Sequence, residues 1–199
     1  MTTRHLDLGC GSSPRNPYLQ AELHGCDIRE IAGEIESLGF IYKKADLING
    51  QIPYSDNYFN SVSAYDFLEH IPRQIVSRDG GVKNSFVDLM SEIHRILKPG
   101  GLFVAVTPCV PHHAAFSDPT HVNFITKQTC EYFAGEKPAA SIYGFSGSFD
   151  VLKNCKDIPS NYFHLNTPVW RKELRKMHRR IFGDGLSHVV WELKACKKV

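Results

Sequence analysis

The stretch of sequence that decides the fold is Leu6-Asp7-Leu8-Gly9-Cys10-Gly11-Ser12-Ser13-Pro14. A short apolar run, typical of a buried strand, leads directly into a turn that contains two glycines. Glycine lets the backbone approach a ligand closely, and the free amides of such a turn can meet a polar group. NAD-binding proteins and plain tight turns also place a glycine-rich loop after a strand, so the rest of the sequence must decide between these interpretations.

Strand and helix signals alternate along the chain from this stretch onward. The strands that we expect in the first half cover His5 to Gly9, Leu23 to Ile28, Ile41 to Leu47, Ser61 to Tyr65 and Gly101 to Thr107. Before the last of them, apolar residues from Phe86 to Leu97 recur at helical spacing, and residues 98–101 predict where that helix ends. The alternation predicts a doubly wound, Rossmann-like α/β sheet, mostly parallel, whose strand carboxyl ends form the ligand crevice.

The composition is that of one globular domain. The chain has 199 residues, of which 42% are hydrophobic, and a formal net charge of +2. Its six cysteines are scattered, which predicts reduced thiols and neither a disulfide framework nor a zinc site. No apolar run is long enough to span a membrane, so we expect a soluble, cytoplasmic protein. The small net charge does not favour nucleic acid as a partner.

The second half of the chain has a different character. Residues 108–168 are rich in aromatic residues, histidine, proline and glycine, and we interpret them as a substrate region or lid that follows the core of residues 1–107 within a single domain 1–199. Two further strands are expected at Phe149 to Leu152 and Val189 to Ala195. Within residues 169–199 the spacing predicts a helix from Val169 to Phe182 with an apolar stripe of Trp170, Leu174, Met177 and Ile181. We expect this stripe to face the core and the basic side to face water, with an anionic partner as the alternative.

Polar side chains follow the expected strands at their carboxyl ends. Asp27 ends the second strand, where a carboxylate can accept hydrogen bonds from both hydroxyls of a ribose. Asp46 and Leu47 end the third strand, and they combine an acceptor for an exocyclic amine with an apolar surface for a purine. The fourth strand runs into Tyr65-Asp66-Phe67-Leu68-Glu69-His70. Because the carboxyl ends of parallel strands meet in one crevice, these residues predict a nucleoside site.

In these same stretches the sequence resembles the class I S-adenosylmethionine-dependent methyltransferases. The matching pieces are Asp7-Leu8-Gly9-Cys10-Gly11, Cys26-Asp27-Ile28, Ala45-Asp46-Leu47, the stretch from Phe59 to Ile71 and the stretch from Glu92 to Leu102. They occur in the order typical of the family over residues 5–107. The resemblance implies a seven-stranded sheet with its final strand antiparallel, S-adenosylmethionine as the cofactor and S-adenosylhomocysteine as the product.

The resemblance also implies roles for individual residues. The implied cofactor residues are Asp7, Gly9, Cys10 and Gly11 around the methionine part, Asp27 and Ile28 at the ribose, Asp46 and Leu47 at the adenine, and Tyr65, Asp66 and Phe67 along the inner wall. The sequence departs from the family's pattern where Ser13, followed by Pro14, stands in place of a third glycine. The first crossover also leaves room for only a stub of helix, so we expect an unusual shape around the methionyl group.

A histidine-rich stretch from His112 to Phe124 lies in the region expected to cover the substrate. It resembles the H-x-x-x-x-D-P-x-H pattern of methyltransferases that modify surface polysaccharides and sugars. A hydroxyl that accepts a methyl group must lose its proton, and a histidine or carboxylate within hydrogen-bond reach can take it. The candidate catalytic residues are His113, Asp118, His121 and His70. The first three could instead bind a divalent cation, which we do not predict, or shape a turn, and His70 could cap or pack.

The sequence thus predicts a methyltransferase that acts on a small-molecule or saccharide hydroxyl, as a monomer or homodimer. Three alternatives stay open: a nucleic-acid methyltransferase that uses the basic helix, a non-catalytic nucleoside-binding module, and an NAD-dependent enzyme. Salt-dependent binding to DNA or RNA would favour the first alternative, and competition by NAD the third. The aromatic side chains that could line a sugar site or pack in the core are Tyr132, Phe133, Tyr143, Phe145 and Phe149.

Overall fold

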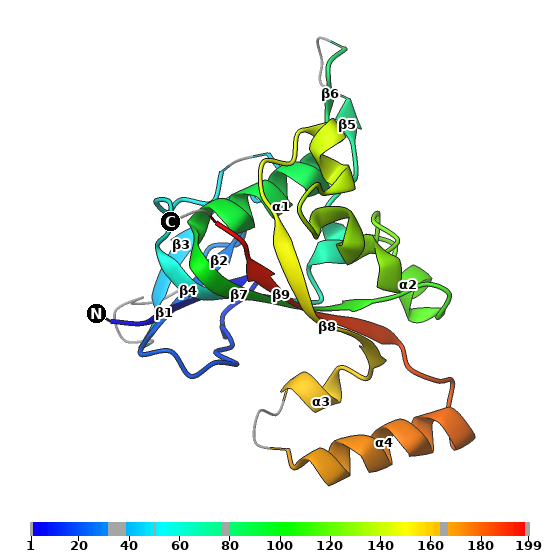
Figure 1. Ribbon diagram of the computed structural model, residues 1–199. Helices are drawn as coiled ribbons and strands as arrows, with labels where there is room; N and C mark the ends of the chain where they lie inside the picture. Colours follow the sequence, from blue (N-terminus) through cyan, green and yellow to red (C-terminus); the bar gives the residue numbers. More distant parts are fainter. Residues whose placement is uncertain (1, 32–38, 50, 77–79, 164–166, 198–199) are drawn as a thin grey trace.

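The computed structural model describes residues 2–31, 39–49, 51–76, 80–163 and 167–197, and a seven-stranded sheet runs through its centre (Figure 1). The sheet order is β3-β2-β1-β4-β7-β9-β8. Its strands are β1 (Arg4–Leu8), β2 (Glu22–Asp27), β3 (Ile41–Lys44), β4 (Phe59–Tyr65), β7 (Leu97–Pro108), β8 (Phe149–Asp157) and β9 (His188–Ala195). All neighbouring pairs from β3 to β7 are parallel, whereas β9 runs antiparallel to both β7 and β8. The predicted doubly wound α/β sheet is confirmed.

The order of the strands places the candidate site. The chain passes from β1 outward to β2 and β3 and then returns across β1 to β4, so the direction of winding reverses between β1 and β4. In open α/β sheets the crevice beyond such a reversal point is where ligands bind. The segments that follow β1, β2, β3 and β4 therefore converge on one edge of the sheet.

Helix α1 (Ser85–Ile96) covers one face of the sheet. Its residues Phe86, Leu89, Met90, Ile93 and Ile96 are buried, as the helical spacing predicts. The 3-10 helices η3 (Lys127–Phe133) and η4 (Ala139–Tyr143) lie on the same side, above the sheet in Figure 1. Strand β7 begins at Leu97, directly after helix α1. Residues 98–101, which were expected to form the end of the helix, therefore belong to the strand.

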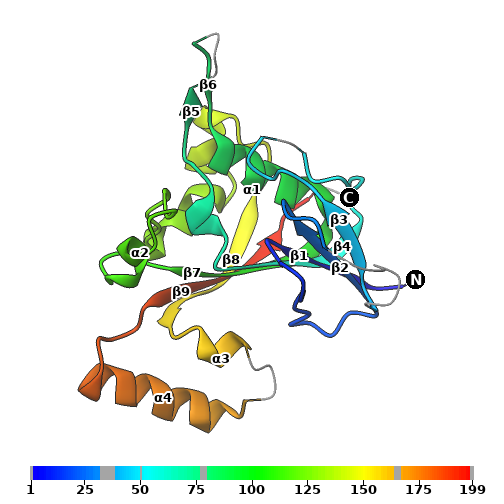
Figure 2. The same ribbon diagram turned by 180° about the vertical axis from the view of Figure 1, so that it is seen from behind.

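The opposite face of the sheet is covered differently. Residues 9–21 pass below it as turns and extended backbone, and α3 (Ser160–Phe163) and α4 (Val169–Phe182) lie below β8 and β9 (Figures 1 and 2). Between these segments and the sheet sits a small cluster of Tyr65, Val106 and Val190. The remaining short elements are η2 (Leu68–His70), β5 (Ile75–Val76), β6 (Val82–Lys83) and α2 (Ala114–Ser117).

The expected orientation of the helix at Val169–Phe182 is wrong, although its bounds are right. None of the residues of α4 is buried, and its apolar stripe faces away from the sheet. The half-buried positions of α4 are instead Lys172, Arg175 and Lys176. These basic side chains face the rest of the domain because it offers them polar partners. Lys176 Nζ lies 3.8 Å from the buried Asp157 carboxylate, and Arg175 donates to the carbonyl of Ser160. Among the described residues, no helix has both the length and the apolar character needed to cross a membrane.

Candidate functional site

The glycine-rich loop after β1 is built for close backbone contact. Gly9 and Gly11 adopt φ angles of +64° and +56°, in the left-handed region that favours glycine. A Cβ atom on Gly9 would lie 2.4 Å from the Phe67 ring, so the loop and the segment after β4 touch directly. The Gly9 amide donates to the carbonyl of Cys26, and the Gly11 amide donates to Asp27 Oδ2 at 2.8 Å. The loop is therefore held against the end of β2.

Asp7 and Cys10 support this loop from within. One Asp7 carboxylate oxygen accepts from the hydroxyl of Ser63 and the other from the amide of Arg15 at 2.8 Å. Burial raises the pKa of Asp7 to about 7. The thiol of Cys10 packs against Gly25, where a Cβ would come within 2.6 Å of the sulfur. Neither residue lines the cavity described next.

A cavity of about 280 Å³ opens at the carboxyl ends of the parallel strands. It is lined by Gly9, Asp27, Ile28, Arg29, Ala45, Asp46, Leu47, Ile48, Asp66, Phe67, His70 and Ile71. The structure thus brings together most of the residues that the sequence predicted around a nucleoside, with carboxylates and apolar side chains on the same walls. Outside the glycine-rich loop, Tyr65 is the predicted residue that does not line the cavity. Its ring lies on the other face of the sheet, beneath the Arg15 guanidinium.

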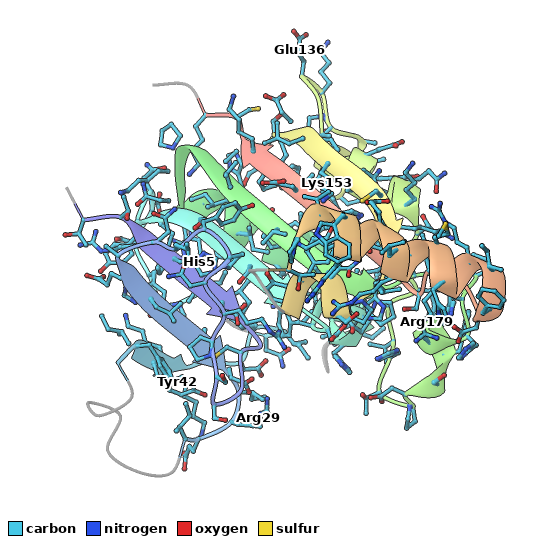
Figure 3. The ribbon with its side chains drawn as sticks, turned by 90° about the horizontal axis from the view of Figure 1, so that it is seen from below. His5, Arg29, Tyr42, Glu136, Lys153 and Arg179 are labelled. Atoms are coloured by element: carbon cyan, nitrogen blue, oxygen red, sulfur yellow. The ribbon has the colours of Figure 1, made fainter. Side chains whose placement is uncertain are left out.

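Asp27 at the end of β2 is already engaged by Arg29. The guanidinium donates from Nε and Nη2 to the two Asp27 oxygens at 3.0 Å, and the Arg29 amide donates as well. Burial alone would raise the pKa of Asp27, but the hydrogen bonds from Arg29 and Gly11 together lower it, so the carboxylate is charged. The Arg29 side chain is 68% exposed, whereas that of Asp27 is 6% exposed. Figure 3 shows Arg29 beyond the end of β2, at the rim of the sheet.

Asp46 closes a turn after β3. Its Oδ1 accepts from the amides of Ile48 and Asn49, and its Oδ2 accepts from the Asn49 side chain at 2.9 Å. This turn ends the strand at Lys44, three residues earlier than expected, because the carboxylate competes for the backbone amides. Leu47 is buried beside the cavity, where its side chain offers an apolar surface.

His70 is the one member of the four candidate catalytic residues that lines this cavity. Its Nδ1 lies 3.0 Å from the Thr120 hydroxyl, and that hydroxyl donates to Asp118 Oδ1 at 2.6 Å. Because the hydroxyl's single proton goes to Asp118, Nδ1 of His70 must be the donor in the other bond. The unprotonated nitrogen of a neutral His70 is then Nε2. Asp118, a carboxylate on an exposed turn, acts on His70 through Thr120, a residue that the sequence analysis did not single out.

His121 stands next to His70 and faces a buried carboxyl group. The two rings meet edge to face with centroids 4.9 Å apart, and His121 Nε2 lies 3.9 Å from Glu69 Oε1. Glu69 Oε2 accepts from the Thr107 hydroxyl at 2.8 Å, while Oε1 is buried without a hydrogen-bond partner. Burial raises the pKa of Glu69 to about 7. The sequence places Glu69 in the stretch after the fourth strand but gives it no role of its own, and the structure adds this buried carboxyl group to the candidate site.

His113 lies in a separate group. Its Nε2 is 2.8 Å from Asp184 Oδ2, beyond the end of α4, and its ring stacks near that of His112. The described residues contain two groups of side chains that could hold a metal ion, one of Glu69, His70 and His121 and one of His112, His113 and Asp184. The trio of His113, Asp118 and His121 that the sequence suggested for a cation is not brought together in either group.

A second cavity of about 580 Å³ lies beyond the His70 segment. It is lined by Arg73, Gln74, Asn84, Phe86, Val87, Thr126, Gln128, Thr129, Tyr132, Phe133, Ala140 and Tyr143. Two residues lie between His70 and Arg73, so the backbone span between them is at most about 11 Å. Of the aromatic residues considered for a sugar site, Tyr132, Phe133 and Tyr143 line this cavity, whereas Phe145 and Phe149 are buried in the core.

Residues 6–105 match the family model described as a methyltransferase domain. The chain is also 28% identical over 131 residues to cycloartenol-C-24-methyltransferase 1 of Oryza sativa subsp. japonica, a match that covers 58% of this chain. The match covers 33% of the rice protein, so the chain spans about a third of the length of this curated relative.

Solved structures share the fold. An S-adenosylmethionine-dependent methyltransferase from Mesorhizobium loti is 15% identical with a TM-score of 0.59, and the match covers 97% of this chain and 91% of that chain. A SAM-dependent methyltransferase from Archaeoglobus fulgidus is 20% identical with a TM-score of 0.54, over 97% and 86% of the two chains. At these identities the likeness establishes the common architecture.

Proposed function

The chain belongs to the methyltransferase-domain family in its class I, S-adenosylmethionine-dependent form, and on that premise we propose that it methylates a hydroxyl group of a small molecule or saccharide. The observation that carries the acceptor chemistry is His70, which lines the cavity and is held at Nδ1 by Thr120, itself bonded to Asp118, so that Nε2 stays outside these bonds. A neutral imidazole nitrogen in this position can accept the proton that a hydroxyl loses on methylation.

The cavity at the strand ends fits the cofactor. Asp27 offers charged oxygens for the ribose hydroxyls, Asp46 lies at the end of the next strand, and Ile28 and Leu47 supply apolar surface for the adenine. Gly9 leaves no room for a side chain, because a Cβ there would overlap the Phe67 ring, so bare backbone forms this part of the cavity wall. When bound, the cofactor supplies an electrophilic methyl group on a sulfonium.

The chain's own residues orient the acceptor and manage its proton. We assign the proton acceptor as His70 Nε2, and the positioning residues as Thr120 and Asp118, which fix the tautomer of that ring. His121 donates from Nδ1 to the carbonyl of Ala115, so its own Nε2 is free to face Glu69 and the neighbouring ring. Burial raises the pKa of Glu69 to about 7, so this carboxyl group, 3.9 Å from His121 Nε2, is suited to take up a proton near neutral pH.

The second cavity supports the choice of acceptor. Its amide, hydroxyl and guanidinium groups can hydrogen-bond to a polyhydroxylated molecule, and its aromatic rings can stack on a sugar ring. We propose that residues 108–168 form much of this acceptor site. We also place the reaction in the cytoplasm, in line with six cysteines that are all free.

The test is a turnover assay that detects S-adenosylhomocysteine, with monosaccharides, nucleotide sugars, simple phenols, amines and oligonucleotides as acceptors. We expect turnover with a hydroxyl acceptor and a loss of about a hundredfold or more in kcat for His70→Ala, with a much smaller change in cofactor affinity, because His70 is one of several residues that line the cofactor cavity. Thr120→Val should lower kcat less and shift its pH profile, because the imidazole then loses its fixed tautomer.

His113→Ala is the matched control, since it removes a histidine of the same region that lies in the other cluster. Its kcat should stay within about twofold of the wild-type value. Turnover with amines or oligonucleotides alone, or full activity of His70→Ala with a hydroxyl acceptor, would contradict the proposal.

A further inference from the structure

The outward face of α4 carries a narrow apolar seam. Trp170, Leu174, Met177 and Ile181 are 58%, 49%, 53% and 63% exposed. Their spacing of four, three and four residues is that of the a and d positions of a heptad, and at 3.6 residues per turn they fall within an arc of about 60°. A stripe this narrow is typical of contact with one partner helix, whereas the apolar face of a helix that packs on a broad surface is wider.

The helix is anchored to the body on its opposite side, which leaves the seam free to meet a partner. Lys172, Arg175 and Lys176 are centred about 180° from the seam around the helix axis. Lys176 approaches Asp157, the carbonyl of Lys172 accepts from Asn161, and the Lys172 ammonium lies over the Tyr162 ring. In Figures 1 and 2 α4 forms the lower boundary of the described structure, and in Figure 3 it lies nearest the viewer with Arg179 on it.

We propose that this seam pairs with the α4 of a second copy of the chain, in antiparallel orientation about a two-fold axis. Such an axis between Leu174 and Met177 superposes the four apolar residues of one helix on those of the other, so that the seam buries itself. The surface is self-complementary, as a two-fold interface requires. Because each body lies on the far side of its own helix, the two bodies point away from each other.

Charge complementarity favours a second copy and this orientation. Glu173 and Arg180 flank the seam on one side, about 2.5 residues before and about 4.5 residues after its midpoint. The two-fold axis brings Glu173 of one helix to within roughly 3 Å, along the helix axis, of the level of Arg180 of the other, and it does so twice. Glu173 also contacts Lys176 of its own helix, but its side chain is 61% exposed and can meet both cations. On the other flank Arg171 of one helix faces His178 of the other. This inference does not depend on the proposed function.

The test is the oligomeric state of the full chain, measured by sedimentation equilibrium across micromolar concentrations. We expect a concentration-dependent dimer. Leu174→Glu should weaken association by at least about a hundredfold, because it places a charge in the centre of the seam on both copies. Ile142→Glu is the control: it adds the same charge at another exposed aliphatic position, 77% exposed on η4, and should leave the dimer unchanged.

Charge reversal tests the orientation. Glu173→Arg alone and Arg180→Glu alone should each weaken the dimer about tenfold, since each replaces two attractive pairs by two repulsive ones. The double reversal should restore it. Both positions are exposed, so folding is preserved, and circular dichroism checks this.

A monomer at every concentration would overturn the proposal, as would single reversals without effect or a double reversal that fails to restore the dimer. A monomer that instead binds anionic lipid vesicles or an oligonucleotide through α4 would also overturn it, with another occupant for the seam. Tryptophan fluorescence detects burial of the seam directly, because the chain has two tryptophans and only Trp170 is exposed, whereas Trp191 is buried.

Discussion

Removal of Arg29 should strengthen cofactor binding. In the structure both oxygens of Asp27 accept hydrogen bonds from the Arg29 guanidinium, so ribose hydroxyls that bind there must displace it or share the carboxylate. An ion pair with one mostly exposed partner contributes about 0.2–1 kcal/mol. Arg29→Ala should therefore raise the affinity for S-adenosylmethionine by up to about fivefold.

Asp27→Asn should have the opposite and larger effect. In the proposed site, the two hydrogen bonds that the ribose hydroxyls donate to the Asp27 carboxylate become bonds to a neutral amide, which costs about 1.5–3 kcal/mol of binding free energy. That loss corresponds to roughly a tenfold to hundredfold weaker affinity. In the Asp27→Asn background, Arg29→Ala should change the affinity for S-adenosylmethionine little, because the Arg29 guanidinium then has no charged carboxylate to pair with.

The assay is calorimetric titration with S-adenosylmethionine and S-adenosylhomocysteine. Lys44→Ala is the matched control, because it removes another exposed cation, paired with Glu30 at the end of the neighbouring strand, that does not line the cavity. Its affinity should equal that of the wild type. Weaker binding by Arg29→Ala would refute the reasoning, since it would mean that the guanidinium contacts the cofactor and does not merely compete with it.

Two further predictions concern the loop and the buried carboxyl group. Gly9→Ala should destabilise the protein by about 2 kcal/mol or more in urea unfolding and weaken cofactor binding, because the residue has a φ of +64° and its Cβ would overlap the Phe67 ring; stability equal to wild type would contradict the geometry. Burial raises the pKa of Glu69 in the folded state to about 7 from an ordinary value of 4.5, so its stabilising contribution is complete below pH 4.5 and is lost as the pH rises to 7. The unfolding free energy of Glu69→Gln, relative to wild type, should therefore rise by roughly 2 to 4 kcal/mol across that window, and a flat difference would show that Glu69 is not buried in this way.

The strand ends could be predicted from sequence because local pattern and topology agree there. Asp27, Asp46 and Asp66 each follow a strand, and a parallel sheet brings such ends to one edge whatever the loops do. The glycines of the loop could also be predicted from sequence, because the positive φ angles of a tight turn are a local requirement that glycine meets.

The catalytic region could not be read in this way. His70 meets Thr120 because the amides of Val122 and Asn123 donate to the Glu69 carbonyl, a contact between segments about fifty residues apart. His113 and His121 are close in sequence, yet the turn of α2 sends them to different clusters. The orientation of α4 was equally hidden, since a helical pattern locates the apolar stripe but not the side on which the body lies.

No helix directly follows the loop after β1 in the described stretch of residues 9–21, and this bears on which ligands the loop can attract. Residues 9–21 continue as turns and extended backbone, so the loop amides are not the positive end of a helix. Dinucleotide sites use that positive end to hold a pyrophosphate. A loop without it offers polar contacts and little net attraction for a dianion, so phosphorylated nucleotides, which are abundant in any cell, gain little there. We therefore expect the missing helix dipole to favour a nucleoside that carries a cationic sulfonium and no phosphate over NAD.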